Sequence, residues 1–392
     1  MMISRGYGRR PRRTHRRSIP FAILQGFIAG LMVWGFGWVG SVLTPAPNRP
    51  ASAELDAARR AFDAGNLDEA IAAAERALTD IPEWPPAALQ MVRALVYRSY
   101  VDYDGAPDRR RALEVSKAVL EANPEDADAL AARAFALHAD GQSLAAYRLA
   151  ERALRRDARH TFARLTLGLA YAGVGSFERG LSELRQAVRA GDYPVDALRA
   201  LAVVQSDSGR YRDAASSIDQ AISVNRTLIP LHFERALYAL QVGDSGAAST
   251  AYLRVLSLDA NNMKARLRIC ELDSMLRQRD AALRYCREVV SLAPDWSDGW
   301  HALGREYFLG GDFGEAQSAL NRCSTLQVMQ GVPPAERTFE CWYLQGQAAE
   351  LNGDCPALVA TYNEFRAMSA IGAFTETWTY PPEGPAACVA SP

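Results

Sequence analysis

The chain lacks the residue patterns that usually carry enzyme chemistry. Its five histidines never occur at a metal-ligand spacing such as His-Glu-x2-His, and no phosphate-binding glycine loop or Gly-x-Ser-x-Gly elbow is present. The paired Cys-x2-Cys spacing of zinc sites is missing too. These absences favour a protein without catalytic activity, cofactor or metal ion.

Negative charge is absent from the first 44 residues, which contain seven arginines and no acid. The overall charge of -1 therefore divides into +7 for this segment and -8 for the remainder. Nucleic-acid binding requires a basic surface that neutralises phosphates. The acidic main body argues against a nucleic-acid partner.

A long apolar run follows the arginines, because residues 19–43 contain no charged side chain. As a helix this run is about 37 Å long, enough to cross the roughly 30 Å hydrocarbon layer of a membrane. Trp34 and Trp38 lie in its outer half, where indole rings favour the interface. Arginine-rich flanks stay in the cytoplasm, so we expect a single-pass anchor with the main body outside the cytoplasmic membrane.

Two alternatives concern this segment. Ala51-Ser52-Ala53 resembles a signal-peptide cleavage site, but the apolar run is longer than a typical signal region and three prolines intervene. A retained anchor is therefore the favoured interpretation. Four glycines on one side of the run would also permit a homodimer through close helix contact, namely Gly26, Gly30, Gly37 and Gly40.

Glycines recur every 34 residues in the main body, at positions 141, 175, 209, 243 and 311, with Arg277 in the one remaining place. Small residues recur at fixed distances before and after each of these positions. Two helices of a hairpin approach closely only where their side chains are small. The register therefore predicts stacked helical hairpins, each with a turn at the recurring position.

This pattern resembles the tetratricopeptide repeat (TPR) family, whose 34-residue unit begins with Trp-x2-Leu-Gly-x2-Tyr. Trp300, Leu303, Gly304 and Tyr307 match that start completely. The resemblance extends over about nine units if two insertions are allowed, one at 99–108 and one near 331–334. It implies an all-α fold: a right-handed superhelical solenoid of about nine TPR-like hairpins, preceded by one transmembrane helix.

The expected organisation has five parts. They are an Arg-rich cytoplasmic tail at 1–18, a transmembrane helix at 19–43, a Pro-rich linker at 44–53, the solenoid at 54–372 and a Pro-rich C-terminal tail at 373–392. The first insertion also contains Asp102, Asp104 and Asp108, but the closing glutamate of a calcium loop is missing. We interpret it as an enlarged acidic turn.

No cysteine precedes residue 270, and six follow. Six cysteines allow fifteen pairings, and the repeat register favours Cys270 with Cys286, Cys323 with Cys341, and Cys355 with Cys388. An even number in an extracytoplasmic domain favours disulfide bridges. The alternative is that cysteine serves as a small core residue, since two of the six replace Gly or Ala in the register.

In proteins of this kind, the first helices of successive units line a concave groove that binds peptides or partner helices, so the resemblance implies a protein partner. The register predicts a largely apolar lining with a few cations. The predicted lining residues are Phe135, His138, Leu165, Leu169, Arg199, Val203, Phe233, Leu237, Leu240, His301, Arg305 and Phe308. The alternative is that several of them pack inside a tightly wound superhelix.

The sequence therefore favours a membrane-anchored, extracytoplasmic scaffold for protein-protein interaction at a bacterial cell envelope, in assembly or secretion. An accessory factor in maturation of exported proteins such as cytochromes, or a sensor module, are the alternatives. The sequence shows no cofactor ligand that would support the maturation factor. The expected cytoplasmic part of about 18 residues is too short to form the signalling domain of a sensor.

Overall fold

The computed structural model describes residues 51–370, 372, 377–380 and 388. The predicted cytoplasmic tail and transmembrane helix lie outside these residues, as does the predicted dimer contact through that helix. None of the described helices is long and apolar enough to cross a membrane. Residues 51–392 form one compact unit, separate from residues 1–50.

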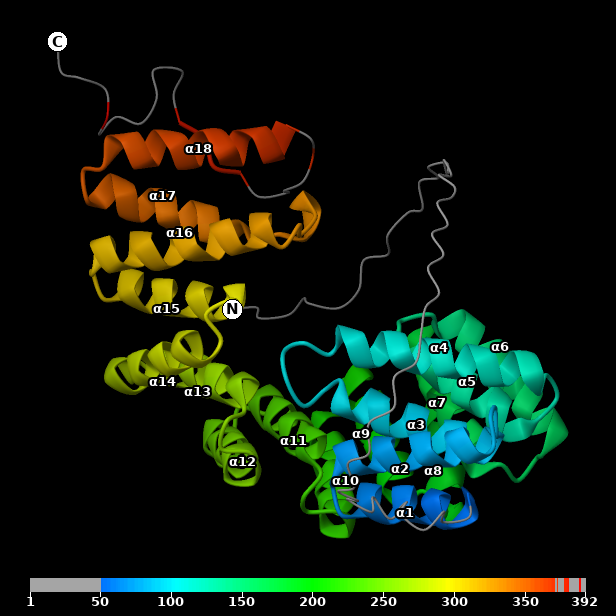
Figure 1. Ribbon diagram of the computed structural model, residues 1–392. Coiled ribbons are helices and arrows are strands. Elements are labelled where there is room, and N and C mark those ends of the chain that lie inside the picture. Colours follow the sequence, from blue (N-terminus) through cyan, green and yellow to red (C-terminus); the bar gives the residue numbers. More distant parts are fainter. Residues whose placement is uncertain (1–50, 371, 373–376, 381–387, 389–392) are drawn as a thin grey trace, which may run out of the picture. The chain divides into compact units, whose positions relative to one another are not determined.

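The described residues fold into eighteen α-helices without a strand, arranged as nine helical hairpins (Figure 1). The first helices of the hairpins are α1 Ala51–Asp63, α3 Pro85–Arg98, α5 Ala127–Ala139, α7 Thr161–Gly173, α9 Pro194–Asp207, α11 Ile229–Gln241, α13 Met263–Met275, α15 Ser297–Leu309 and α17 Phe339–Leu351. The second helices are α2 Leu67–Asp80, α4 Ala106–Ala122, α6 Ser143–Arg156, α8 Phe177–Ala190, α10 Tyr211–Val224, α12 Ser245–Leu258, α14 Arg279–Leu292, α16 Phe313–Met329 and α18 Cys355–Ala370.

The turn positions of the 34-residue register adopt the backbone conformation that selects glycine. The five recurring glycines have φ between 78° and 84°, and Arg277 has a φ of 59°. A left-handed residue directly after a helix lets the chain reverse. The small residues that recur before and after each turn position are also buried, where the two helices of a hairpin cross. Gly168 and Gly180 are examples. The register thus explains the hairpins.

Both insertions lie close to their predicted positions, although the first loop ends at Gly105 and residues 106–108 of the predicted turn are helical. The first forms the loop between α3 and α4, and the second contains the short 3-10 helix η1, Pro334–Glu336, between α16 and α17. The predicted linker is shorter than expected, because α1 begins at Ala51 instead of after Ala53. Four alanines within the first eight residues of α1 favour helix there, and Ala51, Leu55 and Ala58 are buried.

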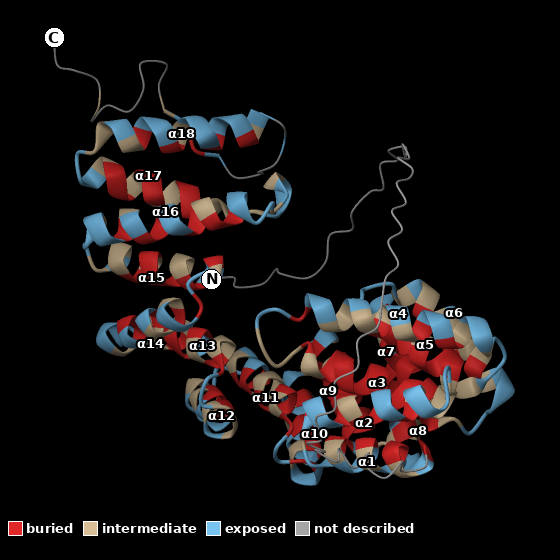
Figure 2. Cartoon of the chain, in the orientation of Figure 1, coloured by how far each residue is buried: buried red, intermediate tan, exposed pale blue. Residues whose placement is uncertain are grey.

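Buried residues are concentrated in α3, α5, α7 and α9 (Figure 2). One hydrophobic cluster runs from Ala58 to Tyr238, whereas the residues beyond it form several smaller clusters. The first five hairpins and the first helix of the sixth, α11, therefore share a continuous core, and the later hairpins are joined by more local packing.

Two loops connect hairpins that are distant in the sequence. Asn225, before α11, donates side-chain hydrogen bonds to the carbonyl oxygens of Phe62 (3.3 Å) and Asp63 (3.1 Å), and Thr227 donates to that of Ala64 (2.8 Å). The neighbouring Gly65 allows this approach, because a Cβ atom there would lie 2.5 Å from the Thr227 hydroxyl oxygen. We call this contact the first bracket.

The second bracket is made by the loop between α3 and α4. Asn262 and Lys264, at the start of α13, donate to the carbonyl oxygens of Val101 (3.0 Å) and Tyr100 (2.7 Å). Tyr103 stacks on Trp296, with ring centroids 4.5 Å apart. The enlarged turn predicted from the sequence therefore has a packing role.

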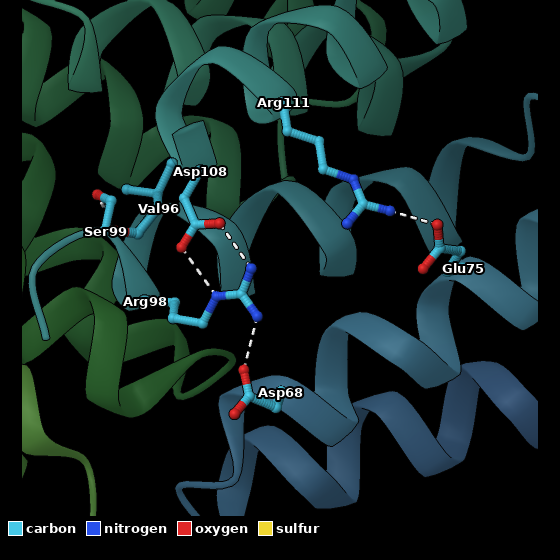
Figure 3. A network of polar contacts seen from close by, with 7 residues as sticks. All are labelled: Asp68, Glu75, Val96, Arg98, Ser99, Asp108 and Arg111. Atoms are coloured by element: carbon cyan, nitrogen blue, oxygen red, sulfur yellow. Dashed lines mark hydrogen bonds and ion pairs between the residues drawn. The ribbon is translucent and has the colours of Figure 1, made fainter. Parts of the chain in front are cut away.

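A polar network holds the base of this loop (Figure 3). Arg98, the last residue of α3, donates to both carboxylate oxygens of Asp108 (2.8 and 2.6 Å) and to Asp68 on α2 (2.6 Å). Arg111 pairs with Glu75 beside it. Asp108, predicted in the acidic turn, therefore lies in the first turn of α4 and serves an ion pair.

Candidate partner-binding surface

The inner side of the first five hairpins is filled by side chains. Arg93 on α3 and Asp196 on α9 form a buried ion pair with N···O distances of 2.9 and 2.5 Å, and the Arg93 guanidinium lies 3.5 Å from the centre of the Phe62 ring. Arg199, also on α9, donates to Glu234 on α11 at 2.8 Å and lies 4.8 Å from the Tyr97 ring centre. These contacts occupy the space where a ligand would enter.

Several residues predicted to line an open groove are therefore internal. Phe135, Leu165, Leu169 and Arg199 are all at least nine-tenths buried. Val203 is partly buried and packs against the main core cluster. For this part of the chain the alternative interpretation is right: the solenoid winds tightly enough that inner side chains pack against one another.

His138 is a partly buried histidine at the end of α5 whose Nδ1 atom has no hydrogen-bond partner. Burial, together with the smaller effect of the nearby positive charge of Arg199, lowers its pKa to about 4. The imidazole is therefore neutral at physiological pH. It adds no positive charge to the inner side.

We predict a pH effect from His138. Between about pH 6.5 and 4, the unfolded chain binds a proton at this site that the folded chain does not, so the free energy of unfolding falls as pH decreases through this range. The expected loss is about 2 to 3 kcal/mol. Urea denaturation at a series of pH values measures it, with His138→Gln as the comparison. Equal pH slopes in the two proteins would contradict this assignment.

The later hairpins differ, because their first helices leave apolar side chains exposed. Leu237 on α11 is 47% exposed, Met275 on α13 53%, Leu309 on α15 67% and Leu351 on α17 58%. Phe233, Leu240 and Phe308 are partly exposed beside them. We call the side of α11, α13, α15 and α17 that carries these residues the C-terminal inner surface.

Charged groups on this surface are largely paired with one another. His301 on α15 lies 2.7 Å from Glu340 on α17, and Arg268 donates to Glu271 at 2.6 Å. Arg305 lies 4.0 Å from the carboxylate of Glu306. The predicted residues His301, Arg305 and Phe308 thus lie on one helix next to the exposed Leu309.

Three residues of this surface escaped the sequence prediction. Met275, Leu309 and Leu351 each lie two residues before a turn position, where earlier hairpins have Ala139, Gly173 and Asp207. The change from small or polar to large apolar residues at one register position is the signal that could have found them. It marks the hairpins in which the inner side is open.

Three disulfides strengthen the same part of the chain, with the pairings that the repeat register favours. The Cα atoms are 5.5 Å apart in Cys270–Cys286, 5.9 Å in Cys323–Cys341 and 5.3 Å in Cys355–Cys388. The first joins the two helices of one hairpin, and the last ties the C-terminal tail to α18. No group of three or more His, Cys, Asp or Glu suited to a metal ion occurs in the described part of the chain.

No protein-family model and no curated protein sequence matches the chain. Solved structures do. One is the crystal structure of the APC/C hetero-tetramer Cut9-Hcn1, at a TM-score of 0.58 and 14% identity over 79% of this chain and 57% of the other. Another is the human IFIT1 dimer with m7Gppp-AAAA, at a TM-score of 0.52 and 14% identity over 71% and 72% of the two chains.

A bacterial tetratricopeptide repeat protein from Parabacteroides merdae is also similar, at a TM-score of 0.41 and 14% identity over 65% of this chain and 98% of the other. The two structures with TM-scores of 0.58 and 0.52 support the fold of the described residues, which is that of a TPR-type solenoid. The chain spans just over half the length of the Cut9-Hcn1 chain that it matches. At 14% identity, the similarity to these structures concerns the fold alone.

Proposed function

We propose that this protein is a membrane-anchored TPR scaffold whose C-terminal inner surface binds a segment of another protein. The observation that carries the proposal is the row of exposed apolar residues Leu237, Met275, Leu309 and Leu351 on four successive inner helices. Apolar anchors on successive helices suit an amphipathic helix or an extended segment.

On the inner surfaces, a protein ligand fits better than a nucleic acid. The arginines of the N-terminal inner side are neutralised, since Arg93 pairs with Asp196 and Arg199 with Glu234. On the C-terminal inner surface the exposed side chains are mainly aliphatic. Phosphate recognition requires unpaired cations on the contact surface.

The proposed location is outside a bacterial cytoplasmic membrane, with the anchor at 19–43 and a role in envelope assembly or secretion. Two features support this location: the arginine-rich flank of the apolar run, and three disulfides, which persist in oxidising compartments. Maturation of exported proteins is the second role compatible with this location.

Crosslinking in the native cells tests the proposed surface. We expect Met275→Glu together with Leu309→Glu to reduce partner recovery at least about tenfold, because each buried apolar anchor contributes on the order of 1.5 kcal/mol or more. Leu144→Glu with Leu253→Glu is the matched control, since these leucines are similarly exposed but lie on the second helices α6 and α12.

The control pair should leave partner recovery within about twofold of the wild type. Equal recovery by both pairs, with helical content unchanged by circular dichroism, would rule out the C-terminal inner surface as the binding site.

A further inference from the structure

A cluster of positive charge lies on the third and fourth hairpins, in a main body that is otherwise acidic. Residues 143–191 contain nine arginines and four acids, a net charge of +5, whereas residues 45–392 together carry -8. The cluster belongs mainly to the outer helices α6 and α8.

Five of these arginines are exposed and have no ion pair among the described residues. The remaining four pair with Glu125, Glu151 or Glu183. The unpaired set, which we call the arginine patch, is Arg148, Arg159, Arg179, Arg185 and Arg189. Unpaired cations on a surface remain available to an anionic partner.

Most of the arginine patch lies on the second helices of two successive hairpins. Arg148 belongs to α6, and Arg179, Arg185 and Arg189 belong to α8. On α8, Arg185 and Arg189 are four residues apart and share one side of the helix. Some exposed arginines of other second helices lie directly beside an acid, as Arg212 does beside Asp213 on α10 and Arg279 beside Asp280 on α14.

We propose that the arginine patch binds the anionic phospholipid headgroups of the membrane in which the chain is anchored. This inference rests on the proposed anchor for the source of its partner. Only seven residues, 44–50, separate the apolar run from α1, and they span at most about 25 Å when extended. The tether holds the solenoid near the bilayer, where each arginine close to an anionic surface is attracted to it.

Vesicle sedimentation tests the patch without the anchor. Residues 51–392 form a separate compact unit, and circular dichroism of this fragment checks that it is folded. We expect it to sediment at low salt with vesicles that contain phosphatidylglycerol. It should not sediment with vesicles of phosphatidylcholine alone. Higher salt should weaken binding, because exposed charges are screened.

Two triple variants separate the patch from net charge. The patch variant carries Arg148→Gln, Arg185→Gln and Arg189→Gln, and should bind at least about tenfold more weakly. The control variant carries Arg110→Gln, Arg212→Gln and Arg322→Gln, which removes three exposed, unpaired arginines from α4, α10 and α16. It should bind within about twofold of the wild type.

Three results would overturn the proposal: equal loss in the two variants, equal binding to both kinds of vesicle, or no binding to phosphatidylglycerol. Binding to acidic peptides or RNA but not to anionic vesicles belongs to the last case and would assign the patch a different partner. The fragment lacks residues 1–50, and the patch lies away from the C-terminal inner surface. These results are therefore independent of the proposed anchor and of the proposed partner binding at the C-terminal inner surface.

Discussion

Replacing Asp196 with alanine is expected to lower the free energy of unfolding by about 3 to 5 kcal/mol. Asp196 accepts two hydrogen bonds from Arg93, and the two side chains are only 2% and 5% exposed. Without the carboxylate, the Arg93 guanidinium would remain buried with a charge that neither water nor an acid balances. The Phe62 and Tyr193 rings beside it cannot replace a carboxylate.

Hydrogen exchange of the α3 and α9 amides measures this loss locally, and urea denaturation measures it globally. The double variant Arg93→Met, Asp196→Leu should recover most of the stability, because apolar residues often replace a buried ion pair without penalty. Asp219→Ala is the matched control: it breaks the Arg235–Asp219 pair, in which Asp219 is 54% exposed, and should cost less than about 1 kcal/mol. A loss of unfolding free energy in Asp196→Ala as small as that of the control would show that the Arg93–Asp196 pair is not a buried ion pair that the fold depends on.

Replacing Trp378 with alanine is expected to destabilise the last hairpin by about 3 to 5 kcal/mol. Trp378 lies in the C-terminal tail yet is 5% exposed, because its ring packs between α17 and α18. Gly346 makes room for it, since a Cβ atom there would lie 2.1 Å from the ring. Tyr380 continues the contact and donates from its hydroxyl to Glu350 at 2.5 Å.

Trp378 and Tyr380 thus cover apolar residues of the last hairpin, at an end of the solenoid where repeat proteins require a cap. Hydrogen exchange in Trp378→Ala should accelerate throughout α17 and α18 and stay unchanged in α5 and α6. Cys388→Ser removes the disulfide that holds the tail to α18 and should affect the same helices. Acceleration spread evenly over all hairpins, or none at α17, would count against a capping role for the tail.

Local features of the repeat were predictable from the sequence. The turn conformation follows from glycine at a fixed period, the helix crossings follow from small residues such as Gly168, and the disulfide Cys270–Cys286 follows from two positions near one crossing. Each of these depends on neighbours within one or two hairpins. A register read from the sequence contains that information.

The filled inner side could not be predicted in the same way. Arg93 and Asp196 are 103 residues apart, and their contact depends on small rotations accumulated over several hairpins. A slight change in rotation per repeat would separate them. The predicted groove residues therefore divide by position along the solenoid: Leu165 is buried, whereas Leu237 is exposed, although both were assigned to the same surface.

The first bracket has a consequence for the order of folding. Stacked repeats usually fold by extension from any local nucleus, because each unit contacts only its neighbours. Here the α1–α2 turn obtains its partners Asn225 and Thr227 only after some 160 further residues have been synthesised. Contacts of such long sequence separation slow folding. The packing of the first hairpin therefore stays incomplete until the ribosome has synthesised the start of α11. Part of the surface of this hairpin is exposed to solvent until then.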